Sequence, residues 1–206
     1  MTFLIAEDAK DLSRQASKWL ETRALSGAAR TAFLPAGKTP EGLYELWEKT
    51  RPEWLEQMGF KQIDDVLTGP SAGVFKHFFE EKLPSYQAKF TWINRADEVA
   101  DVGILGLGLN GHIAFHEPHL PETFYGGCVQ LSETTCRTLA LEKNTWGLTY
   151  GASTFMLSKS LLMIASGETK KEVVAKLLAR SKDLPATSLL THNDFTLIVD
   201  RAASAV

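Results

Sequence analysis

The chain has 206 residues, of which 44% are hydrophobic, 23% charged and 10% aromatic, and its formal net charge is -3. These proportions are typical of a folded domain and exclude a disordered, collagen-like or coiled-coil chain. The 22 basic and 25 acidic residues leave no basic excess, so we expect no nucleic-acid partner and no membrane partner.

We expect one domain spanning residues 1–206, because the sequence has no internal repeat, low-complexity stretch or flexible linker. A chain of this length buries about 70% of the surface that its unfolded form would expose. The two cysteines, Cys128 and Cys136, form neither a CxxC motif nor a zinc spacing, which favours a reducing compartment. The start MTFLIAEDAK has too few apolar residues for a signal peptide, and no apolar run approaches the ~20 residues of a membrane span. We therefore expect a cytoplasmic protein.

Apolar residues at helical spacing, after the acidic pair Glu7-Asp8, predict a first helix over residues 8–25. Strand-like runs and helical patterns then alternate along the chain. The predicted strands are Thr31–Leu34, a weaker one ending at Ile63, Lys89–Ile93, Val102–Leu107, Arg137–Leu141, Leu161–Ala165 and Phe195–Val199. Further helices are predicted to open at Thr39, Ser71 and Thr169. Such alternation predicts a mostly parallel sheet covered on both faces, with ligands beyond the carboxyl ends of its strands.

Two turns that follow predicted strands have the features of anion sites. Gly37, Lys38 and Thr39 lead from a strand into a helix with a Thr cap and a Pro at its first position. Such a helix start presents free N–H groups and the positive end of its dipole. Lys170 lies in a corresponding turn, where a cation at a helix start is favourable only beside an anion. Ordinary capping and exposed lysines are the alternatives, and the Walker P-loop pattern is absent.

Asp64 and Asp65 are adjacent carboxylates between the apolar residues Ile63 and Val66, at the end of a predicted strand. Carboxylates in partly apolar surroundings have raised pKa values and act as bases. The alternative is a turn in which one aspartate caps a helix and the other is solvated.

The densest motif is GILGLGLNGHIAFHEPH, residues 103–119. A GxGxxG pattern begins at Gly106 and matches the dinucleotide fingerprint, but Pro118 and Pro121 leave no room for the long helix that a Rossmann dinucleotide site needs. We therefore expect no dinucleotide cofactor.

The histidines of this motif allow two chemistries. His112, His116 and His119 are close enough in sequence for a metal site, but HEPH is one residue short of HExxH and no Cys or Asp ligand accompanies it. We therefore expect no metal. His112 followed five residues later by Glu117 instead suits a proton carrier, since a carboxylate can fix the tautomer of a histidine and stabilise its cation.

The chain resembles the glucosamine-6-phosphate deaminase/isomerase family in five segments, taken in order: LPAGKTPEGLY, the Asp64-Asp65 pair, GLGLNGHIAFHEP, SGETKKE and LPATSLLTHNDFTLIVD. These segments cover nearly the whole chain. The Glu-Pro after GHIAF is the most specific feature, because the related 6-phosphogluconolactonases carry the Gly-His but normally lack it. The resemblance implies an α/β fold, a three-layer open sandwich with a mostly parallel Rossmann-like sheet. It also implies conversion of glucosamine 6-phosphate and water to fructose 6-phosphate and ammonia without a metal or an organic cofactor.

The resemblance further implies roles for the residues singled out above. Gly37, Lys38, Thr39 and Lys170 match the phosphate-binding positions of the family, so the expected partner is a small sugar phosphate. Asp64 matches the general base, which moves a proton between carbon 2 and carbon 1 of the sugar. A proton transfer of this kind contributes about 10²–10⁴ in rate.

The catalytic loop of the family has its counterpart in residues 110–117. His112, preceded by Gly111, matches the ring-opening acid/base, Glu117 the carboxylate that polarises it, and Asp65 a neighbouring acidic position. Asn110 stands where the family usually has Asp, which leaves Glu117 as the one obvious anion acting on His112. We therefore expect a lower pKa for His112 than two carboxylates would give.

Two further departures concern regulation and assembly. The segment HLPETFYGGCVQLSETTC, residues 119–136, lacks the basic cluster of allosteric bacterial deaminases, so we expect no activation by an amino-sugar phosphate. The chain ends soon after its last predicted strand, which favours a monomer or dimer over a hexamer.

Two other functions remain open at this point. A 6-phosphogluconolactonase would use His112 to activate water on a lactone. A non-catalytic sugar-phosphate sensor would keep the two helix starts while Asn110 weakens the proton relay.

Overall fold

A seven-stranded sheet forms the centre of the computed structural model, which describes residues 1–204. Every neighbouring pair in this sheet is parallel. The spatial order is β1 (Thr2–Ala6), β10 (Phe195–Asp200), β9 (Ser160–Ala165), β6 (Val102–Gly106), β2 (Thr31–Leu34), β3 (Gly59–Gln62) and β5 (Phe90–Thr91). The prediction of a mostly parallel sheet is confirmed.

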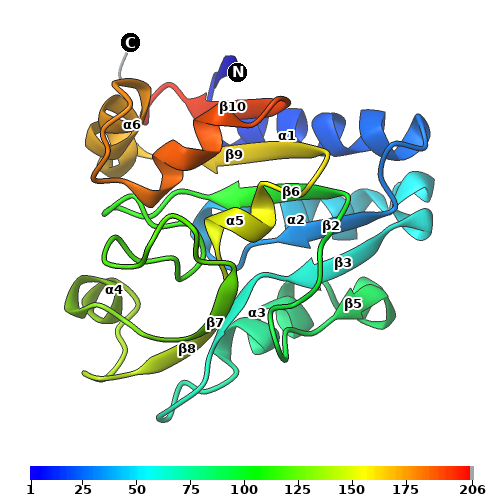
Figure 1. Cartoon of the computed structure of the whole chain (residues 1–206). Coiled ribbons are helices and arrows are strands. Elements are labelled where there is room, and N and C mark those ends of the chain that lie inside the picture. Colours follow the sequence, from blue (N-terminus) through cyan, green and yellow to red (C-terminus); the bar gives the residue numbers. More distant parts are fainter. Residues whose placement is uncertain (205–206) are drawn as a thin grey trace.

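Alternate residues of one strand face two different cores, which makes the molecule three-layered. In β9, Leu161 and Met163 pack into one core, while Leu162 and Ile164 pack into the other. The second core receives the apolar faces of α1 (Ala9–Leu25), α2 (Lys38–Thr50) and α3 (Val74–Lys82). The first core receives α5 (Ala152–Phe155), α6 (Lys171–Leu178) and the small sheet described below. Figure 1 shows α1 and α2 behind the sheet and α5 in front of it. The predicted α/β three-layer sandwich is therefore confirmed.

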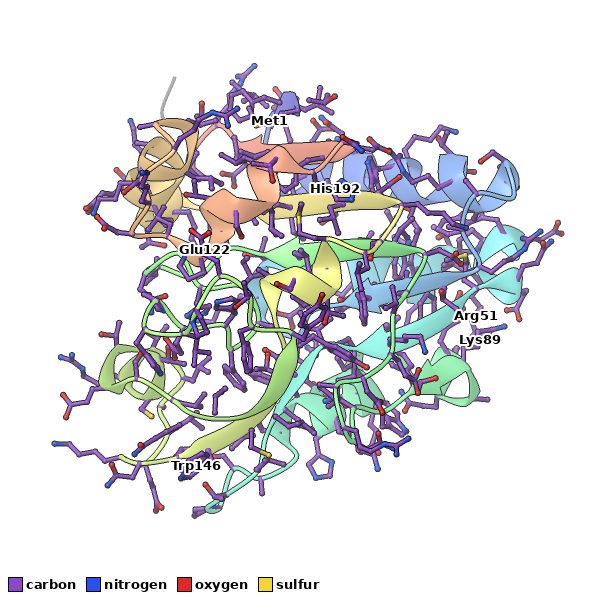
Figure 2. The ribbon with its side chains drawn as sticks, in the orientation of Figure 1. Met1, Arg51, Lys89, Glu122, Trp146 and His192 are labelled. Carbon is purple, nitrogen blue, oxygen red and sulfur yellow. The ribbon has the colours of Figure 1, made fainter. Side chains whose placement is uncertain are left out.

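A second, antiparallel sheet lies beside the main one and was not predicted. Its order is β4 (Asp64–Val66), β8 (Trp146–Tyr150) and β7 (Gly126–Gln130). One residue, Ile63, separates β3 from β4, so the chain passes directly from the main sheet into the small one. Trp146 is labelled in Figure 2 at the lower end of this small sheet, away from the seven-stranded sheet. The predicted strand ending at Ile63 thus corresponds to β3, and the two aspartates open a new strand.

The strand predicted over Arg137–Leu141 is wrong. Residues Glu133–Thr138 form the short helix α4, and Ala140 has a left-handed φ of 54°. The helix forms because Ser132, at its N-cap, accepts a hydrogen bond from Thr135 N. Local capping therefore outweighs the strand-like composition of this segment.

Smaller differences concern element ends. The expected strand over Lys89–Ile93 shortens to β5, and the helix expected from Ser71 begins three residues later, after a turn through Gly73. β1 was not anticipated at all, although its apolar residues continue the edge of the sheet by pairing with β10. Among residues 1–204, no helix combines the length and the apolar character needed to cross a membrane.

Candidate active site

A cleft of about 410 Å³ opens at the carboxyl ends of the central strands. The segments that follow β2, β3, β6 and β9 supply most of its walls, and α4 supplies the rest. In Figure 1 this edge of the sheet lies on the left, toward α4. β2 continues to β3 on one side and lies against β6 on the other, so the cleft is at a topological switch point of the sheet. This is the edge at which the sequence predicted a ligand.

Seven of the residues singled out from the sequence line this one cleft: Gly37, Lys38, Thr39, Asp64, Asn110, His112 and Lys170. Three others are buried and do not line the cleft: Asp65, Gly111 and Glu117. Segments far apart in the chain therefore converge on one site.

The first anion turn is an uncapped helix start. Gly37 precedes α2 with a φ of 118°, a conformation that favours glycine, and no side chain in the described part of the chain caps the helix. α2 begins at Lys38, so the expected Thr39 cap is wrong: Thr39 lies inside the first turn. Because no side chain of residues 1–204 caps this end of the helix, its backbone N–H groups and dipole are available to an anion.

The second anion turn offers a lysine side chain. Residues Glu168–Lys170 form a 3-10 turn before α6, and Lys170 Nζ donates to the carbonyl oxygen of Leu107. Burial lowers the pKa of Lys170. Two basic side chains occur among the described residues that line the cleft, Lys38 and Lys170, and Lys38 is exposed.

Asp200 holds this second turn in place. Its carboxylate accepts hydrogen bonds from Ser166 Oγ and from Gly167 N. Arg51 and Lys89, labelled in Figure 2, lie toward the opposite edge of the sheet and are remote from the cleft. Lys170 is thus a half-buried cation on the wall of the cleft.

The two adjacent aspartates have different environments. Asp65 accepts hydrogen bonds from the backbone N–H groups of Val66, Phe75 and Lys76, and from Gln62 Nε2. It therefore caps the start of α3 and fixes the end of β3. This agrees with one part of the alternative given in the sequence analysis, in which one of the two aspartates caps a helix. Asp65 is 8% exposed and does not line the cleft.

Asp64 is 5% exposed, lines the cleft, and its carboxylate accepts no hydrogen bond within the described part of the chain. Burial raises the pKa of Asp64 well above its ordinary value, and the neighbouring Asp65 carboxylate adds to the shift. A carboxylate of this kind is a stronger base than a solvated one. The other part of that alternative, in which the second aspartate is solvated, is wrong because Asp64 is buried.

Glycines allow His112 to reach the cleft. A Cβ on Gly108 would lie 2.3–2.6 Å from atoms of the His112 ring, and one on Gly111 would lie 2.5–3.0 Å from the Leu184 side chain. Gly111 also has a φ of 80°. These two positions of the GxGxxG pattern are therefore explained by packing and by a tight turn.

A chain of hydrogen bonds connects His112 to Glu117 through Asn110. Asn110 Oδ1 accepts from His112 N at 3.2 Å, and Asn110 Nδ2 donates to Glu117 Oε2 at 3.1 Å. Glu117 has no exposed surface.

Burial lowers the pKa of His112 to about 4, the Glu117 carboxylate opposes the shift, and the Lys170 ammonium adds to it. The shift is downward, and burial is its largest cause. His112 is therefore neutral at pH 7.

Two residues near His112 were missed from the sequence. Thr135 Oγ1 lies 3.4 Å from His112 Nδ1, and Ser132 Oγ donates to Thr135 Oγ1 at 3.1 Å. Ser132 N donates to Glu117 Oε1 at 3.1 Å. Ser132 is a residue type that favours the N-cap of a helix, and Thr135 follows it three residues later. This pattern was a helix-start signal that could have located α4.

The other histidines of the motif do not converge on a metal. His116 Nδ1 accepts a hydrogen bond from Ala152 N at 2.9 Å in a buried position, and His119 is exposed. Across residues 1–204, no group of three or more His, Cys, Asp or Glu side chains is arranged to hold a metal ion.

An open α/β sandwich with a buried carboxylate, a neutral histidine and an uncapped helix start in one cleft is a suitable scaffold for sugar-phosphate chemistry. The family described as glucosamine-6-phosphate isomerases/6-phosphogluconolactonase matches residues 76–198, which is more than half of the chain. The chain belongs to this family.

Individual relatives are similar along nearly the full chain. Glucosamine-6-phosphate deaminase of Bacillus pumilus is 28% identical over 244 residues, which covers 100% of both chains. Glucosamine-6-phosphate deaminase 1 of Bacillus subtilis is 30% identical over 211 residues, with 84% of this chain and 86% of the relative covered.

Solved structures share the fold. A monomeric glucosamine-6-phosphate deaminase superposes with a TM-score of 0.83 at 24% identity, covering 98% of each chain. The 6-phosphogluconolactonase of Trypanosoma brucei superposes with a TM-score of 0.80 at 16% identity, covering 98% of this chain and 97% of its own. The two branches of the family therefore share this architecture.

Proposed function

We propose that the protein is a glucosamine-6-phosphate deaminase, which converts glucosamine 6-phosphate and water to fructose 6-phosphate and ammonia. The observation that carries the proposal is the buried Asp64 carboxylate, which lines the same cleft as neutral His112, the uncapped start of α2 and Lys170. The deaminases among the similar proteins support it.

Substrate binding begins at the phosphate. The backbone N–H groups of Gly37, Lys38 and Thr39 and the Lys170 ammonium surround the dianion, with the α2 dipole directed toward it. Anchoring the phosphate at this end directs the sugar carbons toward Asp64 and His112 on the other walls of the cleft.

The chemistry then proceeds in three steps. His112 exchanges protons with the ring oxygen and the anomeric hydroxyl, which opens the pyranose to the aldehyde. Asp64 removes the proton from carbon 2 and returns it to carbon 1, through the enolamine that is the amino-sugar form of an enediol. The resulting imine at carbon 2 is hydrolysed by water to the ketone, and ammonia leaves. Each proton transfer contributes about 10²–10⁴ in rate.

A second candidate is 6-phosphogluconolactonase, which the fold likeness to lactonases favours. In that reaction His112 would activate water on the lactone. A lactone hydrolysis needs no base at carbon 2, so this reaction gives the buried Asp64 carboxylate no catalytic role.

The deciding experiment follows ammonia and fructose 6-phosphate from glucosamine 6-phosphate, with 6-phosphogluconolactone assayed in parallel on the same purified protein. We expect equal release of ammonia and fructose 6-phosphate. Hydrolysis of the lactone alone would establish the second candidate. No turnover of either substrate, together with a rise in melting temperature on adding glucosamine 6-phosphate, would instead indicate a sugar-phosphate sensor.

The oligomeric state, a monomer or a dimer, stays a prediction that light scattering can test.

A further inference from the structure

Thr135 and Ser132 form a small hydroxyl pair behind the His112 ring. Thr135 is 1% exposed, and its Oγ1 lies 3.4 Å from His112 Nδ1. The pair belongs to the start of α4, which connects the catalytic loop to the rim of the cleft: Ser132 N binds Glu117, and Thr135 also lines the cleft.

The hydrogen-bond roles in this pair follow from counting donors. Ser132 Oγ accepts from Thr135 N and donates its one proton to Thr135 Oγ1. Thr135 Oγ1 is therefore already an acceptor, and its own proton needs a partner. His112 Nδ1 is the acceptor within reach. If Nδ1 accepts, the proton of a neutral imidazole must be on Nε2.

We propose that Thr135 is a positioning residue that donates to His112 Nδ1 and so fixes the tautomer in which Nε2–H is presented to the substrate. This inference rests on the proposed function and deepens it, because it specifies that resting His112 meets the sugar oxygen as a hydrogen-bond donor. A neutral imidazole serves in this way in other aldose–ketose isomerisations. The neutral state of His112 at pH 7 agrees with such a role.

The connection also explains how α4 participates without a charged side chain. Asn110, Glu117, Ser132, Thr135 and His112 form a closed ring of contacts, each joined to the next. These contacts hold His112 at two places, its backbone N and its imidazole Nδ1. Thr135 is the residue that contacts the imidazole nitrogen.

The test is ¹⁵N NMR of the histidine side chains in the full chain at neutral pH, without substrate, with His112 assigned from a His112→Gln variant. We expect Nδ1 of His112 to have the shift of an unprotonated nitrogen and Nε2 that of a protonated one. Thr135→Val removes the hydroxyl at nearly constant volume and should give a mixture of the two tautomers, whereas Thr135→Ser should restore the original spectrum.

Activity supplies the second readout. We expect Thr135→Val to lower kcat about 3- to 10-fold, the worth of one neutral hydrogen bond, with little change in KM. Thr22→Val is the matched control, since Thr22 is also a helical threonine, bonded to Lys18 O on α1 and exposed. It should change neither the spectrum nor kcat.

The inference and the proposed function fail separately. A protonated Nδ1 in the unmodified chain, or an unchanged His112 spectrum in Thr135→Val, would overturn the inference even in an active enzyme. The spectrum of the unmodified chain decides this even if a variant does not fold. Absence of ammonia release in the unmodified chain would overturn the proposed function, while the NMR result would still decide which nitrogen carries the proton.

Discussion

Asn110 Nδ2 donates to Oε2 of Glu117 at 3.1 Å, so an amide satisfies one oxygen of a carboxylate that has no exposed surface. Ser132 N satisfies the other oxygen. A buried carboxylate needs such donors because burial separates its oxygens from water. The amide at position 110 therefore stabilises Glu117 without adding a second negative charge beside His112.

Asn110→Asp should raise the pKa of His112 above its value of about 4, because a second carboxylate favours the imidazolium. It should also lower the free energy of unfolding at pH 8 by about 1–3 kcal/mol, because the hydrogen bond to Glu117 becomes a repulsion. An NMR titration of His112 and denaturant melts measure the two effects. Asn144→Asp adds the same charge at an exposed site and should leave the pKa of His112 unchanged. Equal pKa values in all three proteins would contradict the prediction.

Asp64→Asn should abolish most activity, by about 10²–10⁴-fold, while stabilising the fold. Between the ordinary pKa of 3.8 and the raised pKa in the fold, folded Asp64 keeps a proton that the unfolded chain has released. Raising the pH through this window therefore lowers the free energy of unfolding. Asparagine removes this penalty, so the gain should be larger at pH 8 than at pH 5. Urea melts at both pH values test this, and a variant that is less stable at pH 8 would show that Asp64 has a stabilising partner.

Asp65→Ala should have the opposite effect on stability, with a loss of about 1–2 kcal/mol, because the start of α3 loses its cap. Activity should fall as well, since the same carboxylate fixes the strand that carries Asp64. Asp8→Ala is a matched control, because Asp8 caps α1 through Asp11 N. We expect a similar loss of stability there with unchanged kcat. Full activity in Asp65→Ala would mean that Asp64 is positioned without its neighbour.

Lys170→Met should weaken binding of sugar phosphates, seen as a smaller rise in melting temperature on adding fructose 6-phosphate and as a higher KM. Lys171→Met removes the adjacent, exposed charge from the same helix start and should preserve both. The contrast depends on burial, because a half-buried ammonium interacts with an anion more strongly than a solvated one. Equal losses in both variants would indicate a diffuse electrostatic effect.

The sequence by itself determined the alternation of strands and helices, and with it the parallel sheet and the edge at which the ligand site lies. Those features follow from local patterns: apolar runs such as Leu161–Ala165 and helix starts such as that after Gly37. The resemblance of the motifs to a known family also singled out Asp64, His112 and Lys170, which the structure brings to one cleft.

Only the tertiary structure decided the surroundings of each of two neighbouring residues. Asp64 and Asp65 are chemically identical and adjacent, yet Asp64 lines the cleft and Asp65 accepts from N–H groups of α3, which lie ten and eleven residues further along the chain. The small sheet and the contact of Thr135 with His112 likewise depend on pairing between distant segments. Burial is the largest cause of the pKa shifts of His112 and of Asp64, and burial is not encoded in a local pattern of residues.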